Sequence, residues 1–344
     1  DMKNAQIETS FGFDTAAKTY SELIGNIERD ATSAVKYWHF IRLMGRAASH
    51  VTLECALQTH PNITLISEEV QAKGTTLAEI GDYIVDVVVK RAAAGKNYGV
   101  LLVPEGLVEF IPDIKVMIDE LSTILGRDEQ YLRSLPDHSE RAQYLNTQLT
   151  AESAQVYNSL PVAIQEVLLT RDSHGNVPLS QVETERLLID LVSDKIRLMK
   201  ARGETEAKFS PLSHFFGYEG RCAAPSNFDA DYTYSLGYAA AHLIRGGLTG
   251  YTVNVQNVTK PVDQWVAGGT PVTMMLNLEK RKGKMVPVIK KALVDLDGKP
   301  FKVFAENRDK WALEDHYIFP GPIQYFGPAE VCDAPTMTLA LEKK

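Results

Sequence analysis

The sequence KYWHFIRLMGR, residues 36–46, combines a strand signal with a turn signal. Aromatic and β-branched side chains dominate residues 36–43, a composition typical of a buried β-strand. Gly45 then introduces a turn at Met44-Gly45-Arg46. Ala48, Val51 and Cys55 follow at helical spacing, so the pattern predicts a strand, a turn and a helix in that order.

The same alternation of strands and helices continues along the chain. A short apolar strand is predicted at residues 63–66. Thr76 and Glu79 form a capping-box pattern that opens a helix to about residue 91. A further strand is predicted at residues 98–103, ending in Pro104-Glu105-Gly106. Strands and helices at this spacing predict an α/β fold whose parallel sheet is flanked by helices.

The pattern also predicts three parts along the chain. Residues 1–110 are expected to form the first α/β domain. Residues 111–208 have helical periodicity and polar, proline-containing joints, which predict a helical insertion. From residue 209 to residue 344 the α/β character returns.

Three local signals in this last part predict its elements. Asp229 is expected to be the N-cap of a helix that ends at Gly246-Gly247, and residues 251–255 are expected to form a strand. Asp297-Gly298, between two apolar segments, predicts a β-hairpin.

Composition excludes several classes of protein. The chain has 344 residues, of which 44% are hydrophobic and 23% charged, so we expect a globular protein. Its net charge of −8 argues against binding to nucleic acid or to an anionic membrane. We found no signal peptide or membrane anchor in the sequence. The 3 cysteines have no CxxC spacing, which favours the reducing cytoplasm.

Two strand ends carry groups suited to binding a polar or anionic ligand. In parallel sheets ligands bind at the carboxyl ends of the strands, where Arg46 and Glu105 are expected. The Arg46 guanidinium matches the geometry of phosphate or carboxylate, and the Glu105 carboxylate can accept hydrogen bonds from sugar hydroxyls. Taken alone, each motif is also compatible with a simple solvent-facing turn.

Two further motifs carry similar chemistry. Tyr218 and Arg221 flank Gly220 in YEGR and suit an oxyanion, although an exposed turn would have the same sequence. Lys36 and Tyr37 begin a strand, so they should lie at the opposite end of the sheet from Arg46. There they could reach a ligand of a neighbouring subunit, or they could simply be surface residues.

The sequence gives little support for a zinc site, a phosphate-binding loop or a catalytic nucleophile. The histidines and the cysteine between residues 39 and 60 match no zinc spacing. The glycine-rich segments lack the lysine and hydroxyl residue of a phosphate-binding loop, and no nucleophile elbow is present.

Several motifs in a fixed order resemble a known family. They are GFDTA (residues 12–16), KYWHFIRLMGR, THPN, VPEG, GYEGR, YTVNVQN and PGPIQYFGP. Together they resemble the phosphofructokinase superfamily, specifically its long pyrophosphate-dependent members, over nearly the entire chain. The resemblance implies the phosphofructokinase-like fold, including the helical insertion.

The resemblance also implies roles for individual residues. Met44, Gly45 and Arg46 would contact fructose 6-phosphate, as would Glu105. The other residues implied in substrate binding are Tyr218, Arg221, Lys36 and Tyr37, the last two reaching the substrate of the adjoining subunit. A homodimer or a larger homo-oligomer is therefore expected.

The implied activity is reversible phosphoryl transfer from pyrophosphate to the 1-hydroxyl of fructose 6-phosphate in glycolysis, with Mg²⁺ as cofactor. The family's Gly-Gly-Asp-Asp donor loop and its catalytic-base segment are not found in these 344 residues. Asp1 resembles the last aspartate of the base segment, so it is expected to lie beside the base and to help hold the metal. The sequence thus predicts the acceptor-site half of the enzyme, with the donor half elsewhere.

Three alternatives remain open. The chain could be a non-catalytic regulatory subunit or sugar-phosphate binding module of the same fold. It could use ATP as the donor, because the residues that choose the donor lie mostly in the absent half. A purely structural protein would require the ordered motifs to be accidental.

Overall fold

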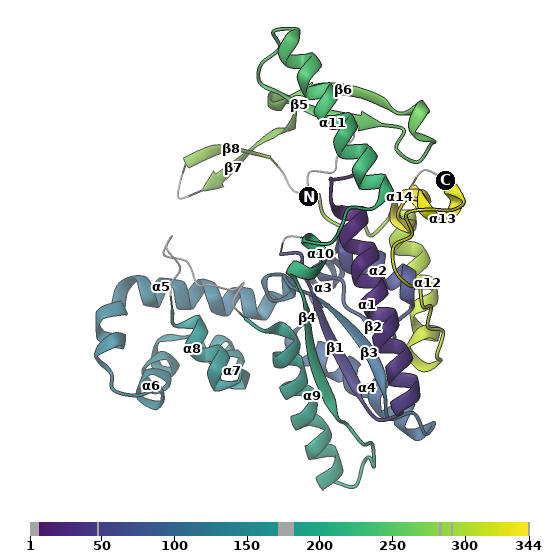
Figure 1. Ribbon diagram of the computed structural model, residues 1–344. Helices are drawn as coiled ribbons and strands as arrows, with labels where there is room; N and C mark the ends of the chain where they lie inside the picture. The colour runs from purple at the N-terminus through teal and green to yellow at the C-terminus, as the bar shows by residue number, and fades with distance from the viewer. Residues whose placement is uncertain (1–6, 47, 171–181, 282–283, 290–291, 343–344) are drawn as a thin grey trace.

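The computed structural model describes residues 7–46, 48–170, 182–281, 284–289 and 292–342 (Figure 1). A parallel four-stranded sheet in the order β2-β3-β1-β4 forms its centre. The strands are β1 (Trp38–Leu43), β2 (Ile63–Thr64), β3 (Gly99–Pro104) and β4 (Pro211–Phe216). The α/β fold with a parallel sheet flanked by helices is therefore confirmed.

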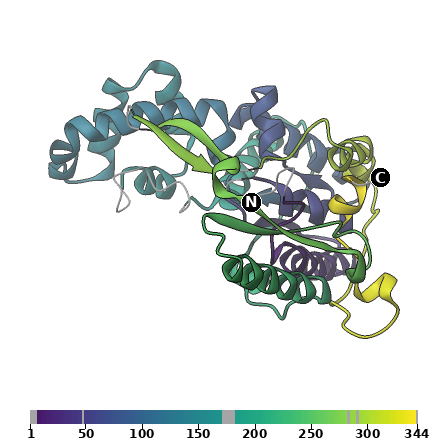
Figure 2. The same cartoon turned by 90° about the horizontal axis from the view of Figure 1, so that it is seen from above.

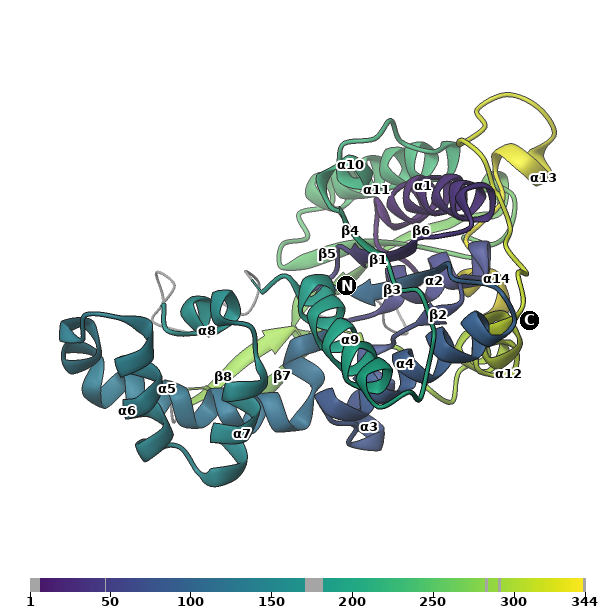
Figure 3. The same ribbon diagram turned by 90° about the horizontal axis from the view of Figure 1, so that it is seen from below.

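Helices cover both faces of this sheet, which explains why every residue of β1 and β3 is buried. On one face, Ile41 and Leu43 pack in a core with α1 (Phe13–Ala34) and α2 (His50–Thr59). On the other face, Trp38 and Phe40 pack in a core with α4 (Leu77–Ala93) and α9 (Thr184–Ala201). Figure 3 shows the sheet between these two layers. Neighbouring side chains of β1 thus enter opposite cores, as the strand period requires.

The helices α2 and α4 end close to where the sequence predicts, whereas α1 and α3 (Ser67–Lys73) were not predicted. The capping box of α4 is present, since Thr76 Oγ1 accepts from the Glu79 amide and Glu79 Oε2 accepts from the Thr76 amide, at 3.3 and 2.8 Å. The strand predicted over residues 63–66 is shorter, because Ile66 is already the N-cap of α3.

Helices dominate the chain after β3. The short 3-10 helix η1 (Leu107–Phe110) is followed by α5 (Pro112–Ser134), α6 (His138–Gln148), α7 (Ala151–Ser159) and α8 (Val162–Leu168). These helices extend to one side of the sheet (Figures 1 and 2). The helical character expected of this segment is found, while the division into three domains stays a prediction.

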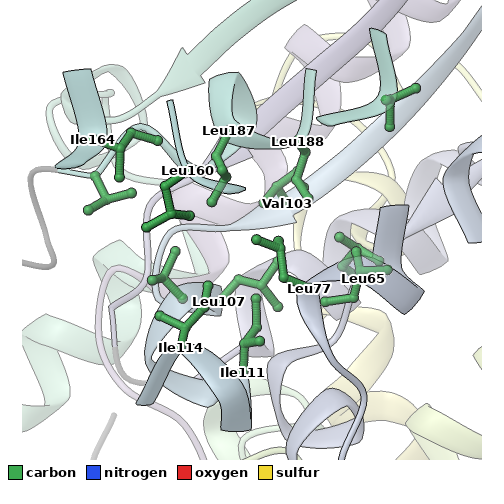
Figure 4. Close-up of a cluster of buried hydrophobic side chains, with 14 of the residues drawn as sticks. Leu65, Leu77, Val103, Leu107, Ile111, Ile114, Leu160, Ile164, Leu187 and Leu188 are labelled. Atoms are coloured by element: carbon green, nitrogen blue, oxygen red, sulfur yellow. The ribbon is translucent and has the colours of Figure 1, made fainter. Parts of the chain in front are cut away.

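One hydrophobic core joins these helices to the sheet. Leu107, Ile111 and Ile114 lie close to Leu160 and Ile164 in this core, as Figure 4 shows. Leu187 and Leu188 of α9 belong to the same core, and α9 contacts both β1 and β4. This packing fixes α9 beside the carboxyl ends of the central strands.

The last part of the chain begins at the end of β4. It contains α10 (Tyr218–Arg221), α11 (Asn227–Arg245), β5 (Tyr251–Gln256), η3 (Val262–Gln264), β6 (Val266–Pro271), η4 (Val272–Met275), β7 (Leu276–Arg281), β8 (Lys284–Ile289), α12 (Lys299–Leu313), α13 (Ala329–Cys332) and α14 (Met337–Glu342). The pairs β5-β6 and β7-β8 are antiparallel. Within the described residues, no helix has the length and apolar character that a membrane crossing requires.

Two predictions in this part are wrong. Asp297-Gly298 forms no hairpin, because Gly298 is the N-cap of α12. Pro300 occupies the first turn of that helix, and Phe301 and Phe304 are buried at helical spacing, which outweighs the turn signal. Asp229 is not the N-cap of α11 either. Ser226 takes that position, where its hydroxyl accepts from the Asp229 amide at 3.2 Å.

Candidate functional site

The carboxyl ends of three strands meet at one edge of the sheet. Leu43, the last residue of β1, lies opposite Pro104 of β3 and Phe216 of β4. The Met44 amide donates to the Phe216 carbonyl and the Glu105 amide to the Leu43 carbonyl, both at 3.0 Å. The turns that follow the three strands are therefore held side by side.

Glu105 links two of these turns. Its side chain is buried, with 8% exposed, and its Oε2 accepts from the Gly45 amide at 3.1 Å. Its Oε1 lies 3.5 Å from Nε of Arg46, whose side chain is largely exposed. Glu105 thus orders the turn that carries the exposed guanidinium.

The close approach of the turns requires glycine at two positions. Gly45 has φ +142°, a backbone conformation that residues with a Cβ rarely adopt. At Gly106 a Cβ would lie 2.1 Å from the Arg46 carbonyl oxygen, far inside van der Waals contact. These glycines explain why the arginine and the glutamate occur in the tripeptides MGR and PEG.

The third turn supplies Tyr218 and Arg221 on the short helix α10. The Arg221 guanidinium lies over the Tyr218 ring, 5.6 Å from its centroid. Both side chains are exposed, while Gly217 before them is anchored because Tyr20 of α1 donates its hydroxyl to the Gly217 carbonyl. The exposed side chains of Tyr218 and Arg221 thus follow directly after the anchored residue Gly217, where they can contact a ligand.

All the residues predicted at this edge line one cavity of about 650 Å³. Its lining is Arg42, Met44, Gly45, Arg46, Glu105, Glu183, Phe215, Tyr218 and Arg221. The volume suits a phosphorylated sugar, and the lining offers guanidinium groups for an anion and carboxylates for hydroxyl groups.

Three residues of this lining, Arg42, Glu183 and Phe215, were missed in the sequence, as was Glu185 beside them. Arg42 is a buried cation in the apolar strand β1, and this contrast was the available signal. It lies 4.1 Å from the Phe215 ring centroid, and its Nε is 2.7 Å from Oε2 of Glu185. Burial raises the pKa of Glu185, and Arg42 opposes this shift. Glu183 and Glu185 carry no comparable signal, because carboxylates are common in the first turn of a helix.

Two predicted site residues, Lys36 and Tyr37, do not line this cavity, and a third lies outside the described residues. Lys36 and Tyr37 immediately precede β1, so they lie at the opposite end of the strand from Arg46. There the Lys36 ammonium lies 4.8 Å from the Tyr37 ring centroid, and Lys36 is exposed. Asp1 lies outside the described residues, so the structure does not place it.

The described residues contain no group of three or more His, Cys, Asp or Glu side chains that could hold a metal ion. Because Mg²⁺ is usually held by one or two carboxylates together with phosphate oxygens of the substrate, magnesium stays a prediction from the resemblance. Among the histidines between residues 39 and 60, His39 pairs with His214 through a 3.0 Å contact between Nδ1 and Nε2.

Comparison with known proteins agrees with the motifs at this site. Residues 4–244 match the family model for phosphofructokinase. The chain is 55% identical to the pyrophosphate–fructose 6-phosphate 1-phosphotransferase of Porphyromonas gingivalis, over all of this chain and 62% of that protein. The identity is 53% to the enzyme of that name from Treponema pallidum, over all of this chain and 60% of that protein.

Plant relatives of the same name have two kinds of subunit. The chain is 52% identical to subunit beta from Ricinus communis, over 99% of this chain and 60% of that protein. It is 40% identical to subunit alpha 2 from Arabidopsis thaliana, over 99% of this chain and 55% of that protein. The chain thus spans little more than half of each of these relatives. The family match covers well over half of this chain, which belongs to the phosphofructokinase family.

Proposed function

We propose that this chain carries the acceptor site of a pyrophosphate-dependent phosphofructokinase. The reaction is the reversible transfer of a phosphoryl group from pyrophosphate to the 1-hydroxyl of fructose 6-phosphate, giving fructose 1,6-bisphosphate and phosphate. The observation that carries the proposal is the register of β1, β3 and β4, which gathers Arg46, Glu105 and Arg221 around one cavity.

The charges of the cavity support a phosphorylated ligand. Arg46 is largely exposed beside Glu105, and no carboxylate of the described residues forms an ion pair with Arg221. In our proposal both guanidinium groups bind the phosphate of the sugar, each with two parallel N–H donors. The Tyr218 ring lies beside the Arg221 guanidinium, which is 5.6 Å from the ring centroid.

Glu105 has a different task in this proposal. One of its oxygens is already engaged by the Gly45 amide, which fixes the carboxylate in the cavity wall. The other oxygen, near Arg46, is the acceptor for a sugar hydroxyl. Met44 and Gly45 supply backbone and surface contacts in the same wall. Because phosphoryl transfer depends mainly on positioning and charge neutralisation, holding the sugar in one orientation is the contribution of this site.

Other parts of the proposal rest on the resemblance. Lys36 and Tyr37, at the far end of β1, are proposed to reach the sugar phosphate bound to a second subunit, which makes the protein a homo-oligomer. Asp1 is proposed to lie beside the catalytic base and to help hold Mg²⁺, which would supply charge neutralisation at the donor. A role in glycolysis is part of the same resemblance, and the three free cysteines favour a reducing compartment such as the cytoplasm.

An assay of the intact protein tests this function. Fructose 1,6-bisphosphate formation is measured with pyrophosphate and, separately, with ATP as the donor. We expect turnover with pyrophosphate, and we expect an Arg221→Ala variant to lose most of it. Turnover with ATP alone would identify the other donor. Fructose 6-phosphate binding without turnover on either donor would indicate a regulatory or sugar-phosphate binding subunit instead.

A further inference from the structure

Arg42 occupies an unusual place in the central strand of the sheet. It is the penultimate residue of β1 and shares a face with Trp38 and Phe40, which are completely buried. The other side chains on this face of β1 are apolar, and α9 packs against β1. Arg42 is therefore the point at which an apolar core meets the cavity.

The buried charge of Arg42 is compensated by one carboxylate and one aromatic ring. Its side chain is 9% exposed and that of Glu185 is 3% exposed, and the two form an ion pair of 2.7 Å between Nε and Oε2. The Phe215 ring stacks on the guanidinium. A buried cation needs such compensation, because removing it from water is otherwise strongly unfavourable.

Arg42 keeps donors that no described residue accepts from. A guanidinium has five N–H donors, and the ion pair with Glu185 is made at Nε. Within the described residues, no hydrogen bond from Nη1 or Nη2 is found, and Arg42 lines the cavity together with Arg46 and Arg221. The unused fork is therefore available to a ligand, in an orientation that Glu185 and Phe215 fix.

We propose that Arg42 is a specificity-determining residue that binds the phosphate of the sugar phosphate from the floor of the cavity. This inference rests on the proposed function and adds a third guanidinium to it. Because Arg42 is desolvated and held in place, its hydrogen bonds to an anion are stronger than those of an exposed arginine. Arg42 thereby makes the cavity bind phosphorylated sugars more tightly than unphosphorylated ones.

Calorimetric titration of the chain with fructose 6-phosphate and with fructose tests the inference. Two altered proteins are compared with the wild type. Arg42→Lys keeps a cation beside Glu185 and loses the planar fork. The double variant Arg42→Gln, Glu185→Gln removes both buried charges, so no unpaired charge is left in the core. Arg197→Gln is the matched control, since Arg197 is an exposed arginine on α9 that pairs with Asp194, outside the cavity lining.

We expect the double variant to bind fructose 6-phosphate about 10- to 100-fold more weakly, the effect of losing hydrogen bonds to a charged group. Arg42→Lys should fall between it and the wild type. Fructose binding should change less than about twofold, so the preference for the phosphorylated sugar should collapse. A purely structural role would lower the melting temperature and leave this preference unchanged.

The outcomes separate the two proposals. If the wild type shows no preference for fructose 6-phosphate over fructose, the proposed function is wrong. If the wild type shows this preference and the folded Arg42→Lys protein retains it in full, the role of Arg42 is wrong and the proposed function stands. If the double variant does not fold, Arg42→Lys alone decides, because it keeps the ion pair with Glu185.

Discussion

The Glu105 carboxylate accepts a hydrogen bond from the Gly45 amide at 3.1 Å, although 60 residues separate the two in sequence. This contact joins the turn after β3 to the turn after β1 at the carboxyl edge of the sheet. The same carboxylate lies 3.5 Å from Arg46. The position of the exposed guanidinium thus depends on the two turns remaining in register.

Gly106→Ala should disturb this arrangement. Its new Cβ would lie 2.1 Å from the Arg46 carbonyl oxygen, and a backbone atom cannot move away alone. We expect a loss of about 1–3 kcal/mol in the free energy of unfolding, as for other overpacked sites, and weaker binding of fructose 6-phosphate. Chemical denaturation and calorimetry measure the two effects.

Gly237→Ala is the control for that experiment. Gly237 lies inside α11, and a Cβ there would meet no heavy atom within 4 Å. Because alanine is the better helix former, this variant should be as stable as the wild type or about 1 kcal/mol more stable. Equal stability of both variants would contradict the close contact at Gly106.

Arg46→Ala should weaken ligand binding and leave the stability of the fold almost unchanged. The Arg46 side chain is 68% exposed, so its removal should change the free energy of unfolding by less than about 0.5 kcal/mol. Fructose 6-phosphate binding should weaken about 10- to 100-fold, because a charge-assisted contact is lost. Arg133→Ala, which removes another exposed arginine, on α5, should change neither quantity. Unchanged affinity in the Arg46 variant would rule out its role in the phosphate site.

Asp229→Ala should destabilise the fold away from the cavity. Asp229 on α11 is buried and accepts from the Gly12 amide at 2.7 Å and from the Thr15 amide at 2.8 Å. It thereby caps α1, whose own N-cap residue has no side-chain acceptor. We expect a loss of roughly 1–3 kcal/mol. Asp231→Ala, on the exposed side of the same helix, is the control and should be nearly neutral.

The pair His39–His214 should make the fold sensitive to acid. Burial lowers the pKa of His39 to about 4, with a further contribution from His214, while Asp30 opposes the shift. Burial also lowers the pKa of His214. Between about pH 6.5 and pH 4 the unfolded chain therefore binds more protons at these histidines than the folded chain does. The pair's contribution to stability is complete above this range and is lost as the pH falls through it.

The difference between the wild type and a His39→Gln variant isolates this effect from the other titrating groups. Denaturation at a series of pH values should show that the wild type loses roughly 1–3 kcal/mol more than the variant on going from pH 7 to pH 4. Parallel curves for the two proteins would show that the histidine pair does not titrate in this way.

Much of the site follows from local sequence. Arg46 and Glu105 each come shortly after a predicted strand, and parallel strands align their carboxyl ends, so their meeting at one edge could be predicted. The strand β4, which brings Arg221 to the same edge, was not predicted. The capping box at Thr76 and Glu79 is similarly local, since both partners lie within one turn of helix.

The features that escaped prediction depend on partners far apart in sequence. Asp229 was expected to cap its own helix, whereas it caps α1, 217 residues away at Gly12. Arg42 finds its ion-pair partner Glu185 only because α9 packs against β1. At Gly298 a local turn signal was outweighed by the burial of Phe301 and Phe304 in the core.

A crystal structure of the chain with fructose 6-phosphate tests the central claim most directly. Our account predicts the sugar in the cavity at the carboxyl ends of β1, β3 and β4, with its phosphate within hydrogen-bond distance of Arg46 and Arg221 and a hydroxyl on Glu105. Density for the sugar elsewhere, for example in the groove between α11 and β6 that Tyr234 and Tyr238 line, with this cavity empty, would contradict the account.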